Sequence, residues 1–171
     1  MHAQAPERPI NESLPFAYID GSCSKERGLY GYGGFLYVAG KYHIIQGTGD
    51  NPKYKDERNI AGEIIGALQV VFLALKLGIK EINLYFDYAG IEQYAAGNWK
   101  AKTPLAKYYC YTLDLLSDDI KLNFIQVAGH TGIEGNELAD YLAKEAVGAK
   151  LRKKDIKALA EFRSRTGSAM A

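Results

Sequence analysis

The sequence Phe16-Ala17-Tyr18-Ile19-Asp20 decides the fold that we expect for this 171-residue chain. Its aromatic and β-branched residues predict a strand, which Gly21-Ser22 is expected to end. A glycine-rich stretch at 28–34 predicts a turn into a second strand at 35–38, and a tight turn then leads into a third strand at 42–46. Three strands joined in this way indicate an antiparallel meander.

The remainder of the chain alternates between helices and strands. Apolar residues recur at helical spacing from Ile60 to Leu75, and Gly78 is a signal for the end of that helix. Further strands are predicted at 82–87 and 121–127, and further helices at 91–96, 105–116 and 136–147. This order predicts an α/β chain with a five-stranded mixed sheet flanked by helices.

Charge and composition indicate one globular domain with a basic end. The chain is 47% hydrophobic and 24% charged, with a formal net charge of +1, which excludes disordered and fibrous classes. Residues 1–149 carry a net charge of −4, and residues 150–171 carry +5. We expect a linker at 1–14, a domain at 15–149, a basic helical extension at 150–166 and a cloning remnant at 167–171.

Location and covalent cross-links follow from what the sequence contains. Cys23 and Cys110 lie far apart and suit neither a disulfide framework nor a four-ligand zinc site. The polar start of the chain does not resemble a signal peptide. The longest apolar stretch, 64–77, is too short to span a bilayer. We therefore expect a cytoplasmic protein with no membrane partner.

Four carboxylates occupy positions where surface acids are not expected. Asp20 and Asp87 lie at the ends of apolar strands, Glu63 lies near the start of the first long helix, and Asp140 lies on the last predicted helix of the domain. Each alone could be a solvated residue or a turn former. If the four converge, their repulsion requires cations, and oxygen ligands favour Mg²⁺ or Mn²⁺.

A histidine in a glycine-flanked loop adds to this pattern. His130 lies within Gly129-His130-Thr131-Gly132, just before the helix that carries Asp140. A lone histidine is more often structural. Beside a metal site, an imidazole on such a loop is suited to proton transfer.

These segments together resemble type I ribonuclease H, the family that hydrolyses the RNA strand of RNA–DNA hybrids. The resemblance covers about residues 14–148 and implies the ribonuclease H-like fold. It rests on Tyr18 to Cys23, the glycine-rich stretch, Asn59 to Ala67, Leu84 to Asp87, Gly129 to Gly132 and Gly135 to Asp140. The most specific of these motifs is the loop histidine followed by Asn-Glu-x-Ala-Asp.

The resemblance also implies the chemistry. Asp20, Glu63, Asp87 and Asp140 would hold two Mg²⁺ ions, for which Mn²⁺ could substitute, and His130 would assist proton transfer or product release. The products would carry 5′-phosphate and 3′-hydroxyl ends. Glu63 would also sense the ribose 2′-hydroxyl that distinguishes RNA from DNA.

The resemblance further implies substrate contacts at Gly21, Ser22, Cys23, Asn59 and Asn136. Cys23 could equally be a packed, inert thiol. Two departures affect strand contacts, because Tyr88 stands where serine is common and Ser24-Lys25-Glu26 replaces a loop that often carries asparagine.

Two basic segments could grip the nucleic acid. A short version of the family's basic handle contains Trp99, Lys100 and Lys102, with Lys107 after it. Lysines can neutralise phosphates and tryptophan can pack on a sugar, although Trp99 could instead anchor a helix end. The basic extension could contact phosphates or remain a solvated tail, and we favour the tail.

Other interpretations stay open. The same fold serves integrases, transposases and junction resolvases that act on DNA, and a non-catalytic hybrid-binding module or a structural scaffold could retain it. The 171-residue length and the loop histidine favour the ribonuclease, and none of the four acids is lost. We expect a monomer with an RNA–DNA hybrid as substrate and no obligate protein partner.

Overall fold

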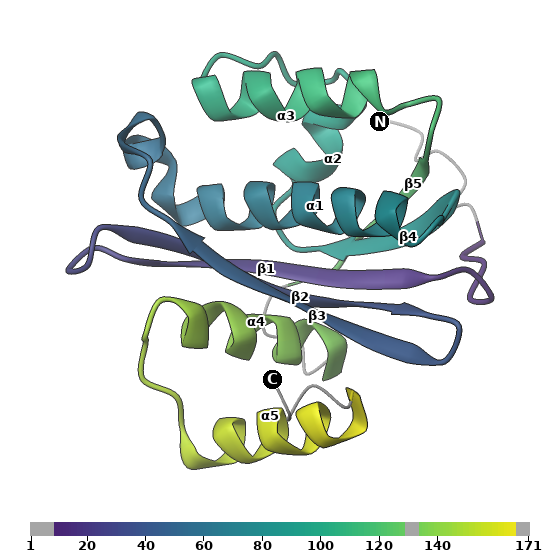
Figure 1. Cartoon of the computed structure of the whole chain (residues 1–171). Coiled ribbons are helices and arrows are strands. Elements are labelled where there is room, and N and C mark those ends of the chain that lie inside the picture. Colours follow the sequence, from purple (N-terminus) through teal and green to yellow (C-terminus); the bar gives the residue numbers. More distant parts are fainter. Residues whose placement is uncertain (1–8, 129–133, 167–171) are drawn as a thin grey trace, which may run out of the picture.

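The computed structural model describes residues 9–128 and 134–166, without the side chains at positions 55, 56, 58 and 59. It contains one mixed sheet in the order β3-β2-β1-β4-β5 with helices on both faces (Figure 1). The strands are β1 (Phe16–Ser24), β2 (Leu29–Val38), β3 (Lys41–Gly49), β4 (Glu81–Phe86) and β5 (Lys121–Gln126). The helices are α1 (Arg58–Lys76), α2 (Gly90–Ala95), α3 (Pro104–Leu115), α4 (Glu134–Ala146) and α5 (Lys153–Thr166), and a 3₁₀ turn covers Pro52–Glu57. The predicted α/β class is confirmed.

Strand β1 is the centre of the sheet. It pairs with β2 in antiparallel orientation and with β4 in parallel orientation, and β2–β3 and β4–β5 continue these two orientations outward. The predicted meander is therefore confirmed for β1 to β3. The parallel half requires crossover connections, which α1 supplies between β3 and β4.

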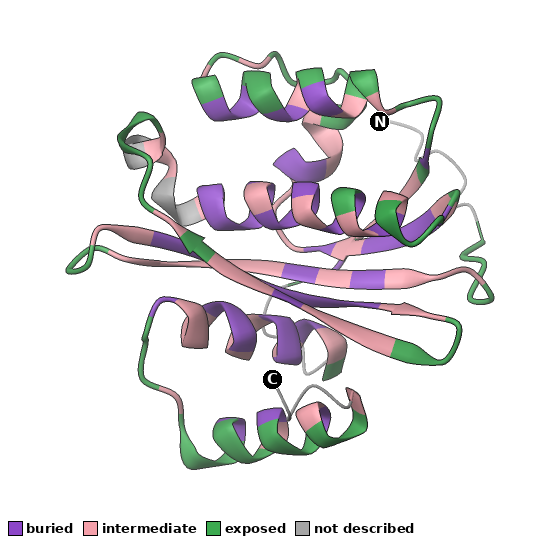
Figure 2. Ribbon diagram, in the orientation of Figure 1, coloured by how far each residue is buried: buried purple, intermediate pink, exposed green. Residues whose placement is uncertain are grey.

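The main core lies between the sheet and α1. Figure 1 shows α1, α2 and α3 above the sheet, and Figure 2 shows the buried residues concentrated where α1 meets the strands. Ile64, Leu68 and Val71 of α1 are at most 1% exposed. Their helical spacing was the sequence signal, and they pack with Ile19 and Leu84 of the central strands.

The glycine-rich stretch is strand, not the predicted turn. Residues 29–38 form one continuous strand, and β1 likewise continues past the predicted end at Gly21-Ser22 to Ser24. A Cβ atom at Gly33 would overlap the backbone of α4 at Ala143 and Leu142. Glycine is needed here so that α4 can cross the strand at close range. The turn itself lies earlier, where Gly28 has a φ of 66°.

The basic extension is a packed helix, which corrects the expectation of a solvated tail. Leu159 and Phe162 of α5 are each 1% exposed and form a second apolar cluster with Phe35, Leu138 and Leu142. An ion pair between Arg163 and Glu145 also joins α5 to α4. The basic residues face outward because the helix is amphipathic.

The helices found in residues 9–128 and 134–166 are too short or too polar to span a bilayer.

We predict that Phe162→Ala lowers the free energy of unfolding by about 3 kcal/mol, because it removes a buried aromatic ring from the α4–α5 cluster. Urea denaturation followed by circular dichroism measures the effect. Ile156→Ala is the matched control on the same helix, since Ile156 is 55% exposed, and we expect it to change stability by less than about 0.5 kcal/mol. Equal effects of the two substitutions would contradict the packing of α5 described above.

Candidate active site

The sheet register brings two of the predicted acids side by side. Strands β1 and β4 are parallel neighbours, with Tyr18 opposite Tyr85. Asp20 and Asp87 each lie two residues further on, so they lie at the same level of the two neighbouring strands. We call this region, with Glu63 and Asp140, the acidic edge. Asp87 follows the carboxyl end of β4, whereas Asp20 lies within β1, just beyond the part that pairs with β4, and not at the predicted strand end. In α/β proteins, ligands commonly bind at the carboxyl ends of parallel strands.

Close packing of α1 on β1 brings the third acid to this edge. A Cβ atom at Gly21 would lie 2.5 Å from the backbone nitrogen of Glu63, and one at Gly62 would overlap the carbonyl of Gly31. The absence of side chains at these glycines allows α1 to approach the strands. Glu63 is consequently buried at 3% exposure, next to the end of β4.

Two peptide groups hold the Glu63 carboxylate in place. Its Oε1 accepts a hydrogen bond from the Asp87 backbone N–H at 2.9 Å, and its Oε2 accepts one from the Tyr88 N–H at 2.8 Å. The pKa of Glu63 is raised to about 8, mainly by burial and also by the negative charges of Asp20 and Asp87, while the two hydrogen bonds act in the opposite direction. This carboxylate is therefore fixed in position and surrounded by like charge.

Asp20 has a similar environment. Burial raises the pKa of Asp20 to about 7, and the charges of Asp140 and Asp87 act in the same direction. The Gly21 backbone N–H donates to Asp20 Oδ1 at 2.9 Å and opposes the shift. Buried carboxylates whose pKa is raised by neighbouring carboxylates are typical of a site for cations or for acid–base chemistry.

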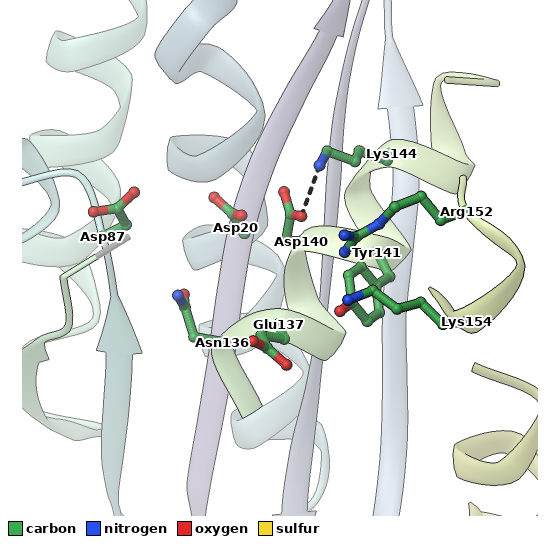
Figure 3. Close-up of a pocket in the computed structure, with 9 residues that line it drawn as sticks. All are labelled: Asp20, Asp87, Asn136, Glu137, Asp140, Tyr141, Lys144, Arg152 and Lys154. Carbon is green, nitrogen blue, oxygen red and sulfur yellow. Dashed lines mark ion pairs between the residues drawn. The ribbon is translucent and has the colours of Figure 1, made fainter. Parts of the chain in front are cut away.

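Asp140 completes the acidic edge from the opposite face of the sheet. It projects from α4, and its Oδ2 lies 2.9 Å from Nζ of Lys144, one helical turn later. Asp140, Asp20 and Asp87 line one cavity of about 310 Å³ together with Asn136, which is 5% exposed. Figure 3 shows the three aspartates in a row, with Asn136 beside them.

Some predicted substrate residues lie near this cavity, and others do not border it. Gly21, Ser22 and Cys23 follow Asp20 on β1 and are partly exposed. Asn59 lies in the first turn of α1, but its side chain is outside the described part of the chain, and His130 is outside it altogether.

The handle residues lie between α2 and α3 and are not among those that line the cavity. Lys100 and Lys102 are exposed. The Trp99 ring is 42% exposed and makes edge contacts with Tyr94 of α2 and with Tyr88, at centroid distances of 5.5 and 6.2 Å. Trp99 therefore packs against the end of α2 and keeps part of its ring exposed.

Sequence reasoning missed the cationic wall of the cavity. Lys144, Arg152 and Lys154 line it, as do Glu137 and Tyr141. For Lys144 a signal existed, because Asn136, Asp140 and Lys144 are spaced by four residues and so share one helix face. Arg152 and Lys154 carried no signal beyond their charge.

The acids suit a divalent metal by their chemistry. All four offer oxygen donors, which Mg²⁺ and Mn²⁺ prefer. Across residues 9–128 and 134–166, no three acidic, histidine or cysteine side chains are gathered closely enough to hold an ion as they stand. Asp140 is paired with Lys144, so metal binding by Asp140 requires this ion pair to rearrange. Each Glu63 oxygen accepts one peptide hydrogen bond and keeps a lone pair for a further partner. The four side chains therefore provide the type of donor atom that Mg²⁺ and Mn²⁺ require.

The fold and the acidic edge together define a class, the ribonuclease H-like α/β proteins with a carboxylate site at the end of parallel strands. The chain belongs to the RNase H family, whose sequence pattern it matches over residues 14–148. Helix α5 and the segment before it lie beyond that match. Family membership supports a hydrolase of the nuclease class.

Individual relatives agree with this family. The chain is 34% identical over 143 residues to a ribonuclease H of Francisella philomiragia, covering 77% of this chain and 89% of the relative. The RNase H1 of the halophilic archaeon Halobacterium salinarum has a TM-score of 0.60 at 25% identity, with 79% and 98% covered. LC11-RNase H1, solved with an RNA/DNA hybrid, has a TM-score of 0.57 at 20% identity, with 78% and 96% covered. The last of these shows likeness of fold alone.

We predict that the metal-free protein loses stability as the pH rises from about 4 to about 8. The pKa values of Glu63 and Asp20 rise from 4.5 and 3.8 in the unfolded chain to about 8 and about 7 in the folded one. The folded state therefore binds more protons in this window, and the free energy of unfolding falls with pH. Urea midpoints measured at pH 5 and pH 8 in EDTA test this, and Glu63→Gln should show a shallower decline. The same decline in the variant as in the parent protein would contradict the assignment to Glu63.

Proposed function

We propose that this protein is a metal-dependent endoribonuclease that hydrolyses the RNA strand of RNA–DNA hybrids, leaving 5′-phosphate and 3′-hydroxyl ends. The observation that carries the proposal is the convergence of Asp20, Asp87 and Asp140 on one cavity, with the buried Glu63 beside them. Membership of the RNase H family and the name of the Francisella relative support it. A protein with the same fold was solved with an RNA/DNA hybrid bound.

The four carboxylates would hold two Mg²⁺ ions, or Mn²⁺ in their place. When bound, such ions supply an activated water and stabilise negative charge on the attacking and leaving oxygens. In the overall reaction a water oxygen bonds to phosphorus and the bond from phosphorus to the 3′-oxygen breaks. That oxygen leaves with a proton, so that a 3′-hydroxyl and a 5′-phosphate result.

The chain's own residues position the substrate. Glu63 is held rigidly by the peptide groups of residues 87 and 88, so its carboxylate can accept a hydrogen bond from a ribose 2′-hydroxyl at a defined place. Asn136, which lines the same cavity, can donate to the sugar or the base edge. Gly21, Ser22 and Cys23 continue β1 beyond Asp20, where the RNA backbone would pass. Asn59 would contact the nucleic-acid backbone from the first turn of α1.

Trp99, Lys100 and Lys102 would contact the DNA strand. They follow α2 in an exposed segment, and the Trp99 ring is linked to the acidic edge through its contact with Tyr88. Tyr88 itself follows Asp87, so the handle and the carboxylates are connected by one short stretch of chain. Lysines here can neutralise phosphates without any sequence preference.

We predict that the protein cuts end-labelled RNA–DNA hybrid in Mg²⁺ or Mn²⁺ and leaves single-stranded RNA and duplex DNA intact. Asp20→Asn or Asp87→Asn should lower the rate by about a thousandfold or more, because the loss of a metal ligand removes several kcal/mol of charge stabilisation. Gel analysis of the labelled products measures both rate and end chemistry. Undiminished cleavage by both variants would refute the proposed site, and cleavage of duplex DNA alone would instead favour a DNA-directed nuclease.

For His130→Ala we predict a rate lower by about tenfold to a hundredfold, since proton-transfer assistance contributes on this scale and metal binding stays intact. The pH–rate profile should also lose the limb that reports imidazole titration. Measurement of kcat and KM between pH 6 and 9 tests this. If turnover and profile match those of the parent protein, His130 has no part in the reaction.

A further inference from the structure

The segment that follows the family-matched region reaches the acidic cavity. Arg152 and Lys154 line it on the side opposite Asp20 and Asp87, although the RNase H match ends at residue 148. Figure 3 shows both side chains directed from the C-terminal segment toward α4, near Tyr141. The cavity thus has an acidic side built from the family domain, and Arg152 and Lys154 add positive charge from outside that domain.

Arg152 is held in a defined orientation. Its Nε and Nη2 donate to Oδ2 and Oδ1 of Asp155 at 3.0 and 3.1 Å, and Asp155 is 5% exposed. A guanidinium has five N–H donors in a fixed plane, so donors remain beyond this two-point contact, and they serve Tyr141, which also bonds to this side chain, and a ligand. Asp155 therefore acts as a positioning residue for Arg152.

Lys154 supplies the unpaired charge. It is exposed, and in the described part of the chain no acidic side chain forms an ion pair with it. Lys144, the third cation of the cavity, is already paired with Asp140. An anion that enters the cavity would meet Lys154 and the remaining donors of Arg152 first.

We propose that Arg152 and Lys154 form a phosphate-binding subsite for the nucleic-acid strand that enters the carboxylate site. The inference rests on the proposed function, which brings one phosphate to the acids. A strand carries a negative charge about every 3.4 Å of helix axis, so phosphates adjoining the reacting one lie within reach of the cavity rim. Cations at that rim offset the repulsion between the strand and the acidic edge.

Binding of hybrid by the full-length chain carrying Asp87→Asn, in Mg²⁺, tests the subsite apart from catalysis. Fluorescence anisotropy with labelled RNA–DNA hybrid at 50 to 200 mM salt gives the slope of log Kd against log salt. Lys154→Ala should reduce the magnitude of this slope by about 0.7 to 0.9, the value for one lost phosphate contact. Between about 50 and 200 mM salt, the variant should therefore lose about threefold less affinity than the protein that keeps Lys154. Lys157→Ala, on the same helix and exposed but not part of the cavity, is the control with equal charge change and should keep the slope.

A charge-neutral pair of substitutions tests Arg152. Arg152→Gln combined with Asp155→Asn removes the ion pair without leaving a buried unpaired carboxylate or changing the net charge. We expect this double variant to bind hybrid more weakly. In the Lys154 series, Lys154→Arg keeps the positive charge, and we expect it to bind hybrid as tightly as the protein with Lys154.

The two proposals fail in different ways. If Lys154→Ala and Lys157→Ala have the same slope while the protein without Asp87→Asn cuts hybrid, the subsite is refuted and the activity stands. If that protein does not cut hybrid at all, the proposed function is refuted whatever the slopes show. Should the Arg152 pair prove unstable in circular dichroism, the Lys154 series alone decides the question.

Discussion

The hydrogen bonds between the Glu63 carboxylate and the peptide N–H groups of residues 87 and 88 join helix α1 to the end of strand β4. Much of the site depends on this contact. It fixes a buried charge where Asp20 and Asp87 already lie, and it does so at the junction where the chain leaves the sheet. Removing a carboxylate from water is unfavourable unless hydrogen bonds or opposite charge compensate. The peptide groups provide part of that compensation, and the metal ions proposed for this site would neutralise the remaining negative charge.

Periodicity in the sequence was sufficient for the elements whose partners are local. The helix from Ile60 to Leu75 was predicted from spacing, and the structure has it at Arg58–Lys76. The strand predicted at 82–87 is observed at Glu81–Phe86. The glycine stretch at 28–34 was misread because its purpose is not local. Gly33 has no side chain so that Ala143, more than a hundred residues later, can pack against it. No window of neighbouring residues contains that information.

The same distinction applies to the site. Asp20 and Asp87 could be predicted because each interrupts an apolar strand, and their convergence follows from parallel pairing. Lys144 was signalled by its helical spacing from Asp140. The approach of Arg152 and Lys154 to the cavity could not be predicted, because it depends on how α5 packs through Phe162 and Leu159. The net charge of +1 gave no sign of this arrangement, because the negative charge of residues 1–149 and the positive charge of residues 150–171 nearly cancel.

The packing of α5 also determines how this chain can be divided. Phe35 of the sheet and Leu142 of α4 belong to the family-matched region, yet they are covered by a helix outside it. A version trimmed to residues 14–148 would expose that apolar cluster to water, and such surfaces promote association between copies. The boundary drawn by sequence similarity therefore does not coincide with the smallest unit that keeps its apolar surface covered, and the extension serves the fold as well as the cavity.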